Sequence, residues 1–159
     1  MSEVTLRDVM RTFPQGVVVV TAPSEEGPRG ITVSSFTSVS LTPPRVVICI
    51  MRDSRAHDAI DRGGFVVNIL SDRQGSLSDH FATPNLTSEQ QFEGLSRRGL
   101  YLDGCLGYLG CRVVERLVQG THTLFVGEVE TCSLGAEGGP LVFFGREYWG
   151  LGENVFTRS

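Results

Sequence analysis

The side chains best suited to hold a ligand lie on one face of a predicted strand within residues 30–41. A strand sends alternate side chains to opposite faces, and one face here combines four hydroxyls with one aromatic ring and no charge. That face carries Thr32, Ser34, Phe36, Ser38 and Ser40. Because hydroxyls both donate and accept hydrogen bonds, a ring among them suits a flat polar molecule. The same pattern is also typical of an ordinary solvent-facing strand.

The opposite face of this strand is mostly apolar, and we expect it to face a core. It carries Ile31, Val33, Ser35, Thr37, Val39 and Leu41. Pro43 and Pro44 then prevent a regular ladder, so the chain turns or bulges before a second, more apolar strand over 45–51.

A second candidate site lies where that apolar strand runs into a predicted helix over 55–62. Arg52 and Arg55 flank Ser54, which suits the N-cap position of the helix. Free N–H groups and two guanidinium forks could bind an anion there. Alternatively, the two arginines pair with neighbouring aspartates on the surface, and the sequence does not decide between these interpretations.

All 14 basic residues are arginine. The chain therefore has no Schiff-base lysine, no Walker A lysine and no lysine general base. The net charge of −4 also argues against a nucleic-acid partner or an anionic membrane surface. Any anionic ligand must be bound by arginine, histidine, hydroxyls or backbone N–H groups.

The three histidines do not form a cluster that indicates a metal site, and no acidic neighbour completes a Ser-His-Asp triad. His57 and His80 lie on predicted helices. His122 differs because it lies in a predicted turn beside Gly120, where its ring could approach a ligand or simply be exposed.

Other motifs are missing. The four cysteines have no C-x-x-C spacing, and the glycines at 104–110 do not match the Rossmann fingerprint. No apolar run reaches the length of a membrane helix, and no signal peptide precedes the chain. We expect a cytoplasmic protein with no membrane or metal partner.

The elements that must position these residues are mostly strands. A helix is predicted over 6–13 from its apolar spacing and the capping-box pair Thr5 and Asp8. A second capping-box spacing, Ser71 and Gln74, predicts a helix that places Leu77 and Phe81 inward. Further predictions are strands over 17–21, 65–70, 111–119, 123–132 and 141–144, a long loop over 83–99, and a hairpin turn at 120–122.

Turns rather than regular crossover helices connect these strands. We therefore predict one domain over 1–159: a mainly β, antiparallel β-barrel with a few short helices.

A specific pattern runs through most of the chain in fixed order. It comprises residues 13–21, 30–41, 43–44, 54–55, 65–70, 74, 81–82, 120–122, 140–144 and 148. These segments resemble the short-chain flavin reductases, the NAD(P)H:flavin oxidoreductases that serve two-component flavin-dependent monooxygenases.

The resemblance implies that the barrel is an antiparallel split β-barrel of the Greek-key type that binds FMN or FAD, usually as a homodimer with the flavin near the subunit interface. Ser54 and Arg55 would hold phosphate, while Phe81 and Ala82 would close the far side of the flavin. The positions that would line the isoalloxazine and ribityl chain are Thr32, Val33, Ser34, Ser35, Phe36, Ser38 and Val39.

His122 matches the histidine of the family's Gly-Asp-His turn, which is associated with nicotinamide binding. The middle residue here is Thr121 rather than Asp, so the chain departs from the family at this contact. Tyr148 is a weaker match to the same site.

We therefore expect hydride transfer from the nicotinamide C4 of NADH or NADPH to the flavin N5, without a catalytic acid or base from the protein. Reduced flavin would then reach a separate oxygenase component. The alternatives are a flavin-binding electron carrier that does not turn over NAD(P)H, and a β-barrel without a cofactor. The choices between FMN and FAD, and between NADH and NADPH, stay open, as does the oxygenase served.

Overall fold

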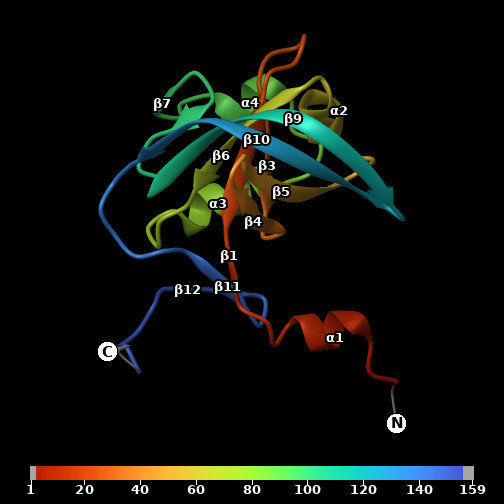
Figure 1. The fold of residues 1–159 in the computed structure, drawn as a ribbon. Coiled ribbons are helices and arrows are strands. Elements are labelled where there is room, and N and C mark those ends of the chain that lie inside the picture. The colour runs from red at the N-terminus through yellow and green to blue at the C-terminus, as the bar shows by residue number, and fades with distance from the viewer. Residues whose placement is uncertain (1–2, 156–159) are drawn as a thin grey trace.

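The main body of the protein is a single curled antiparallel sheet (Figure 1). The computed structural model describes residues 3–155. The sheet has the strand order β3-β2-β6-β9-β10-β5-β4, with every neighbouring pair antiparallel. Its strands are β2 (Val18–Ala22), β3 (Arg29–Val33), β4 (Phe36–Leu41), β5 (Pro44–Met51), β6 (Gly64–Ile69), β9 (Gly107–Gln119) and β10 (His122–Leu134). The prediction of a mainly β, antiparallel fold with short helices is confirmed.

The two edge strands of this sheet, β3 and β4, are consecutive in the chain and are separated only by Ser34 and Ser35. The sheet therefore curls, and this two-residue connection brings the ends of its two edge strands close together. The amide of Cys49 on β5 donates to the Ser35 carbonyl at 3.3 Å, which fixes the junction. Inside the curl lies an apolar core that includes the fully buried Ile48 and Phe125.

The predicted alternation of inward and outward side chains does not continue through residues 30–41. The strand is broken at Ser34–Ser35, and a second irregularity in register falls between Ser38 and Ser40. Val33 is buried as expected, but Val39 and Leu41 are 57% and 88% exposed. The prediction that they face the core of this chain is wrong, because the first break reverses the alternation, Val39 lies at the second irregularity, and Leu41 is the last residue of the strand.

The helices begin at identifiable caps. In α1 (Leu6–Met10) the predicted capping box forms, since the Thr5 hydroxyl accepts from the Asp8 amide and the Asp8 carboxylate from the Thr5 amide. In α2 (Arg55–Asp61) Ser54 is the N-cap, as predicted, and its hydroxyl accepts from the His57 amide at 3.2 Å.

Two helix predictions need correction. The segment after Ser71 makes a turn, and α3 (Gly75–Ala82) begins later with Gln74 as an N-cap that makes no side-chain cap bond. The predicted long loop over 83–99 contains a further helix, α4 (Ser88–Phe92). Its capping box, Thr87 with Gln90, was the signal that the loop prediction overlooked.

The predicted hairpin at 120–122 is confirmed, but its strands are longer than predicted. His122 is the first residue of β10 and pairs with Gln119, so the turn consists of Gly120 and Thr121. Gly120 has φ +56°, a conformation that glycine adopts without steric cost. The long β9–β10 hairpin crosses the top of the molecule in Figure 1.

The chain ends form a separate small sheet below the main one in Figure 1. It joins β1 (Gln15–Gly16), β11 (Val142–Phe144) and β12 (Glu147–Trp149), and β12 was not predicted. A further short pair consists of β7 (Arg97–Arg98) and β8 (Tyr101–Leu102). None of the helices within residues 3–155 has both the length and the apolar character needed to cross a membrane.

Candidate functional site

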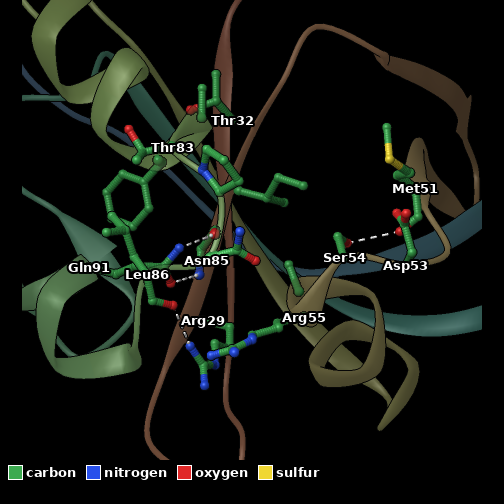
Figure 2. Close-up of a pocket in the computed structure, with 16 residues that line it drawn as sticks. Arg29, Thr32, Met51, Asp53, Ser54, Arg55, Thr83, Asn85, Leu86 and Gln91 are labelled. Carbon is green, nitrogen blue, oxygen red and sulfur yellow. Dashed lines mark hydrogen bonds between the residues drawn. The ribbon is translucent and has the colours of Figure 1, made fainter.

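A cavity of about 490 Å³ opens between β3, the end of β5, the start of α2 and the segment that follows α3 (Figure 2). Strand β3 forms its floor, and residues 83–86 form one wall. The lining residues are Arg29, Gly30, Ile31, Thr32, Met51, Asp53, Ser54, Arg55, Ala56, Phe81, Ala82, Thr83, Pro84, Asn85, Leu86 and Gln91.

Five of the predicted flavin-contacting residues line this one cavity, although they come from three separate parts of the sequence. They are Thr32, Ser54, Arg55, Phe81 and Ala82. The fold therefore brings together an aromatic ring, two hydroxyls and an exposed guanidinium group. This combination can hold a planar ring at one end and an anion at the other.

The other predicted flavin contacts lie elsewhere in the single chain. Ser34, Ser35 and Phe36 line a separate shallow depression beside residues 13–16. Val33 points into the core, and Ser38 and Val39 line none of the described cavities. Their contact with a flavin stays a prediction.

Two of the hydroxyls predicted to contact flavin serve the fold. The Thr32 hydroxyl donates to the Ser78 carbonyl at 2.6 Å and so ties β3 to α3. The Ser35 hydroxyl donates to the Cys49 carbonyl at 2.9 Å. The first bond holds β3 beside the cavity and the second holds the junction between β3 and β4, so fewer hydroxyls are free for a ligand than predicted.

The two arginines of the cavity differ in their surroundings. The Arg29 side chain is 5% exposed, pairs with Glu26 at 2.8 Å and donates to the Leu86 carbonyl at 3.1 Å. Arg55 is exposed and makes no ion pair with any residue that the structure describes. Arg52 likewise forms no ion pair within residues 3–155, so the pairing of Arg52 and Arg55 with neighbouring aspartates is not observed.

The segment that follows α3 is held against β3 by a side chain that the sequence analysis missed. Gln91 accepts a hydrogen bond from the Gly30 amide at 3.1 Å and donates to the Gly30 carbonyl at 2.9 Å. Its amide thus replaces a neighbouring strand at the exposed edge of β3. Arg29 and Gln91 together fix the wall, as the dashed lines in Figure 2 show. The capping box of Thr87 and Gln90, within the segment predicted as a loop, was the sequence signal for α4, the helix that carries Gln91.

Glycine is required at position 30 because the backbone there lies close to the Phe81 ring. A Cβ at this position would clash with Cε1 of the Phe81 ring, which is buried against Phe92 with 5.3 Å between ring centroids. We expect Gly30→Ala to lower the free energy of unfolding by about 1–3 kcal/mol, because the ring cannot move without repacking. Urea denaturation measures this, and Gly16→Ala is the control, since a Cβ there meets nothing within 4 Å. Equal stability of both variants would contradict the prediction.

The two predicted nicotinamide contacts do not line the cavity. His122 pairs with Met51, which does line it, and the Arg52 amide donates to the Thr121 carbonyl at 2.9 Å. The hairpin turn therefore lies beside the end of β5 that borders the cavity. Nδ1 of the His122 ring lies 2.8 Å from the Thr121 hydroxyl.

Tyr148 lies on β12 and contacts α3. Its hydroxyl donates to the Asp79 carboxylate at 2.9 Å and lies 2.7 Å from the Ser78 hydroxyl. Burial is the main cause that raises the pKa of this phenol. Because both contacts are with α3, Tyr148 holds the helix whose C-terminal end supplies Phe81 to the cavity.

The other two histidines are structural. Nε2 of His57 lies 2.8 Å from the Thr123 hydroxyl, and Nε2 of His80 lies 2.8 Å from the Gln91 carbonyl. The four cysteines are free, with Cys105 and Cys111 buried and Cys132 exposed.

Comparisons with known proteins agree on one family. Residues 10–152 match the family described as flavin reductase like domain. The reductase component of 4-nitrophenol 4-monooxygenase/4-nitrocatechol 2-monooxygenase from Rhodococcus opacus is 38% identical over 146 residues, which are 91% of this chain and 78% of that protein. An NADH-dependent FAD reductase from Streptomyces globisporus is 37% identical over 138 residues, which are 82% of this chain and 75% of that protein.

Solved structures give the same result. The structure of the NADH:FAD oxidoreductase of Streptomyces globisporus C-1027 superposes with a TM-score of 0.87 at 32% identity, covering 98% of this chain and all of that one. The flavin reductase of styrene monooxygenase from Pseudomonas putida S12 gives 0.83 at 30% identity, covering 95% of this chain and 100% of that one. The chain belongs to the flavin reductase like domain family.

Proposed function

We propose that this protein is an NAD(P)H:flavin oxidoreductase that reduces FMN or FAD and supplies the reduced flavin to a separate monooxygenase. The observation that carries this proposal is the cavity in which Phe81, Thr32, Ser54 and Arg55 meet, within a chain of the flavin reductase family. Relatives are named as reductase components of two-component monooxygenases, which supports a partner oxygenase here as well.

The residues of the cavity fit a flavin. Phe81 and Met51 offer apolar surface for a fused aromatic ring, while backbone and the Thr32 side chain border it. Arg55 has no carboxylate partner within residues 3–155 and can therefore bind phosphate without first breaking an ion pair. A bound flavin supplies the redox chemistry, as the acceptor of a hydride from NAD(P)H.

The chain itself contributes binding, orientation and the exclusion of water. The wall at residues 83–86 is held in place by Arg29 and Gln91, so the cavity is formed before a ligand arrives. Hydride transfer needs no acid or base from the protein. A site with fixed walls and few charges suits this reaction, because orientation provides much of the rate enhancement.

We further propose that the protein is a homodimer. Large apolar side chains are exposed on β4, near the turn of the β9–β10 hairpin, on α1 and shortly after α1. They are Leu6, Val9, Phe13, Val39, Leu41, Leu117 and Val118, each more than half exposed. A second copy that covers these residues would remove them from water. Analytical ultracentrifugation at micromolar concentration tests this, and a monomer would contradict it.

An anaerobic stopped-flow experiment tests the reductase activity. The protein with flavin is mixed with NADH, then in a separate experiment with NADPH, and the absorbance band of oxidised flavin is followed. Fast bleaching with either donor supports the reductase and identifies the donor. Flavin binding without bleaching would instead favour a flavin carrier, an alternative that the relatives' names do not favour.

His122 is the residue that we propose for the nicotinamide contact. The Thr121 hydroxyl lies 2.8 Å from Nδ1 of His122 and can orient its ring, at the position where the family's Gly-Asp-His turn has Asp. We expect His122→Ala to raise the KM for the nicotinamide donor by about tenfold, the value of one hydrogen bond, and the KM for flavin much less. Steady-state kinetics with each substrate varied in turn measure both constants.

Two outcomes bear on this role of His122. Thr121→Asp keeps a hydrogen-bond acceptor beside the imidazole, so this variant should retain the nicotinamide KM of the unmodified protein. If His122→Ala leaves both KM values unchanged, or raises only that for flavin, His122 is not the nicotinamide contact.

A further inference from the structure

One largely buried histidine links the helix that borders the cavity to the strand that begins with His122. His57 lies on α2, and Nε2 of its imidazole lies 2.8 Å from the hydroxyl of Thr123 on β10. The His57 side chain is 15% exposed and Thr123 is 3% exposed. Within residues 3–155, no other side-chain hydrogen bond joins α2 to β10.

We propose that His57 is a positioning residue for hydride transfer, which acts through Thr123 to hold the turn that carries His122 in a fixed place relative to the flavin. The inference rests on the proposed reductase function and on the proposed nicotinamide contact of His122. His57 does not line the cavity, so its effect must pass through another residue.

The two ends of this link lie beside the two halves of the proposed reaction site. His57 is in the first turn of α2, whose N-cap Ser54 lines the cavity. Thr123 directly follows His122, and neighbouring residues of a strand point to opposite faces. The buried Thr123 therefore meets α2, while His122 lies on the face of its cross-strand partner Met51, which lines the cavity.

The imidazole of His57 makes no second hydrogen bond within residues 3–155. Its Nδ1 is buried without a hydrogen-bond partner, and the Asp58 carboxylate lies 3.5 Å away. A pair of apolar side chains in place of His57 and Thr123 could pack against Phe125 without leaving a polar atom unpaired, at little or no cost in stability. Packing alone therefore does not explain an imidazole here, whereas the bond from Nε2 to Thr123 does.

Backbone bonds hold the same turn only from the side of β5. The Arg52 amide donates to the Thr121 carbonyl at 2.9 Å, and the Ser54 hydroxyl donates to the Met51 carbonyl at 2.9 Å (Figure 2). The bond from His57 adds a restraint from the helix. Hydride transfer needs reacting atoms about 3–3.5 Å apart, and a displacement of about 1 Å can lower a rate about 100-fold, so such a restraint affects the reaction directly.

Anaerobic stopped-flow reduction of FMN by NADH, or by NADPH where only that donor bleaches the flavin, tests the proposal together with fluorescence titration of FMN. Thr123→Val removes the hydroxyl and keeps the shape of the side chain, while His57→Phe keeps a ring against Phe125 and removes Nε2. For both variants we expect the reduction rate constant at saturating donor to fall at least about tenfold, with the dissociation constant of FMN within about twofold of that of the unmodified protein.

Two conservative variants should retain the rate. Thr123→Ser keeps the hydroxyl, and His57→Gln has a side-chain amide that can reach the position of Nε2. We expect both to reduce FMN within about threefold of the unmodified rate, since each keeps a hydrogen bond between α2 and β10.

Arg116→Ala is the matched control. Arg116 also ties α2 to the β9–β10 hairpin, through the Asp61 carboxylate and through the Asp61 carbonyl at 2.6 Å. Asp61 is the last residue of α2, at the opposite end of the helix from the cavity. We therefore expect Arg116→Ala to keep the reduction rate of the unmodified protein.

Unchanged reduction rates in both Thr123→Val and His57→Phe would overturn the proposal. So would an equal loss in Arg116→Ala, or a rise in the dissociation constant of FMN as large as the loss of rate, since the effect would then come from the fold or from the flavin site. In each of these cases the unmodified protein still reduces FMN, so the proposed function survives. Absence of reduction by either donor in the unmodified protein would overturn that function, and this inference with it.

Discussion

Replacing Arg55 with alanine is expected to raise the dissociation constants of both FMN and FAD by about 10- to 100-fold, the value of a charge-assisted interaction with phosphate. Arg55 lines the cavity and has no ion-pair partner within residues 3–155. Arg55→Ala therefore removes ligand contacts, and no carboxylate loses an ion-pair partner. Because the side chain is exposed, the variant should fold with unchanged stability. Fluorescence titration with each flavin measures the effect.

Arg52→Ala is the matched control for this experiment. Arg52 is an exposed arginine three residues away that also makes no ion pair within residues 3–155, but it does not line the cavity. Charge and spacing alone could not distinguish these two arginines, whereas the resemblance to a family selected Arg55. If the two variants weaken flavin binding equally, the effect comes from the loss of a positive charge near the cavity, and Arg55 is not a specific phosphate contact. Arg55→Lys should fall between alanine and arginine, because lysine keeps the charge but lacks the planar fork.

Local signals were enough to predict much of the fold. The Ser54 cap, the Thr5 capping box and the hairpin around Gly120 each depend on residues within four positions of one another, and all three are present. Such features follow from backbone hydrogen bonding and turn geometry, which do not need the rest of the chain.

One misprediction at the centre of the molecule came from long-range structure. The alternation over residues 30–41 breaks where the sheet curls at Ser34–Ser35, and that curl is set by the pairing of distant strands. The predicted core position Val39 is consequently exposed within this chain. Periodicity predicts a face only while a strand stays regular.

The walls of the cavity were only partly predictable for the same reason. Arg29 and Gln91 lie 62 positions apart in the sequence, and their roles depend on contacts with Leu86 and Gly30. The residues that precede and follow Arg29 and Gln91 in the sequence do not indicate these contacts. The resemblance to a family supplied Ser54, Arg55 and Phe81, which periodicity alone did not combine into one site.

Replacing Asn68 with leucine is expected to destabilise the fold by about 3 kcal/mol, because it leaves buried polar backbone groups without partners. Asn68 on β6 is fully buried. Its amide donates to the Val19 carbonyl and to the Thr21 hydroxyl, both at 3.1 Å, and its side-chain oxygen accepts from the Leu102 amide at 2.9 Å. Leucine matches its size, so the loss measures hydrogen bonding rather than a cavity. Urea denaturation measures the change.

A pair of threonine variants separates this network from a general cost of removing hydroxyls. Thr21, which is fully buried, donates to the Leu100 carbonyl at 2.6 Å, whereas Thr131 is exposed and lies 3.3 Å from the Tyr101 hydroxyl. We expect Thr21→Val to cost about 1–2 kcal/mol and Thr131→Val no more than about 0.5 kcal/mol. Equal costs, or an Asn68→Leu variant as stable as the unmodified protein, would show that the network adds no net stability.

The consequences of losing Asn68 should extend to the flavin site. Leu102, whose amide Asn68 binds, packs in the same apolar cluster as Phe81 and Phe92. Phe81 is the ring that borders the cavity, and Phe92 holds it edge-on from α4. A buried amide on β6 thus fixes the chain segment that supports the wall of the site. We therefore expect Asn68→Leu to weaken flavin binding even at temperatures where the variant is fully folded.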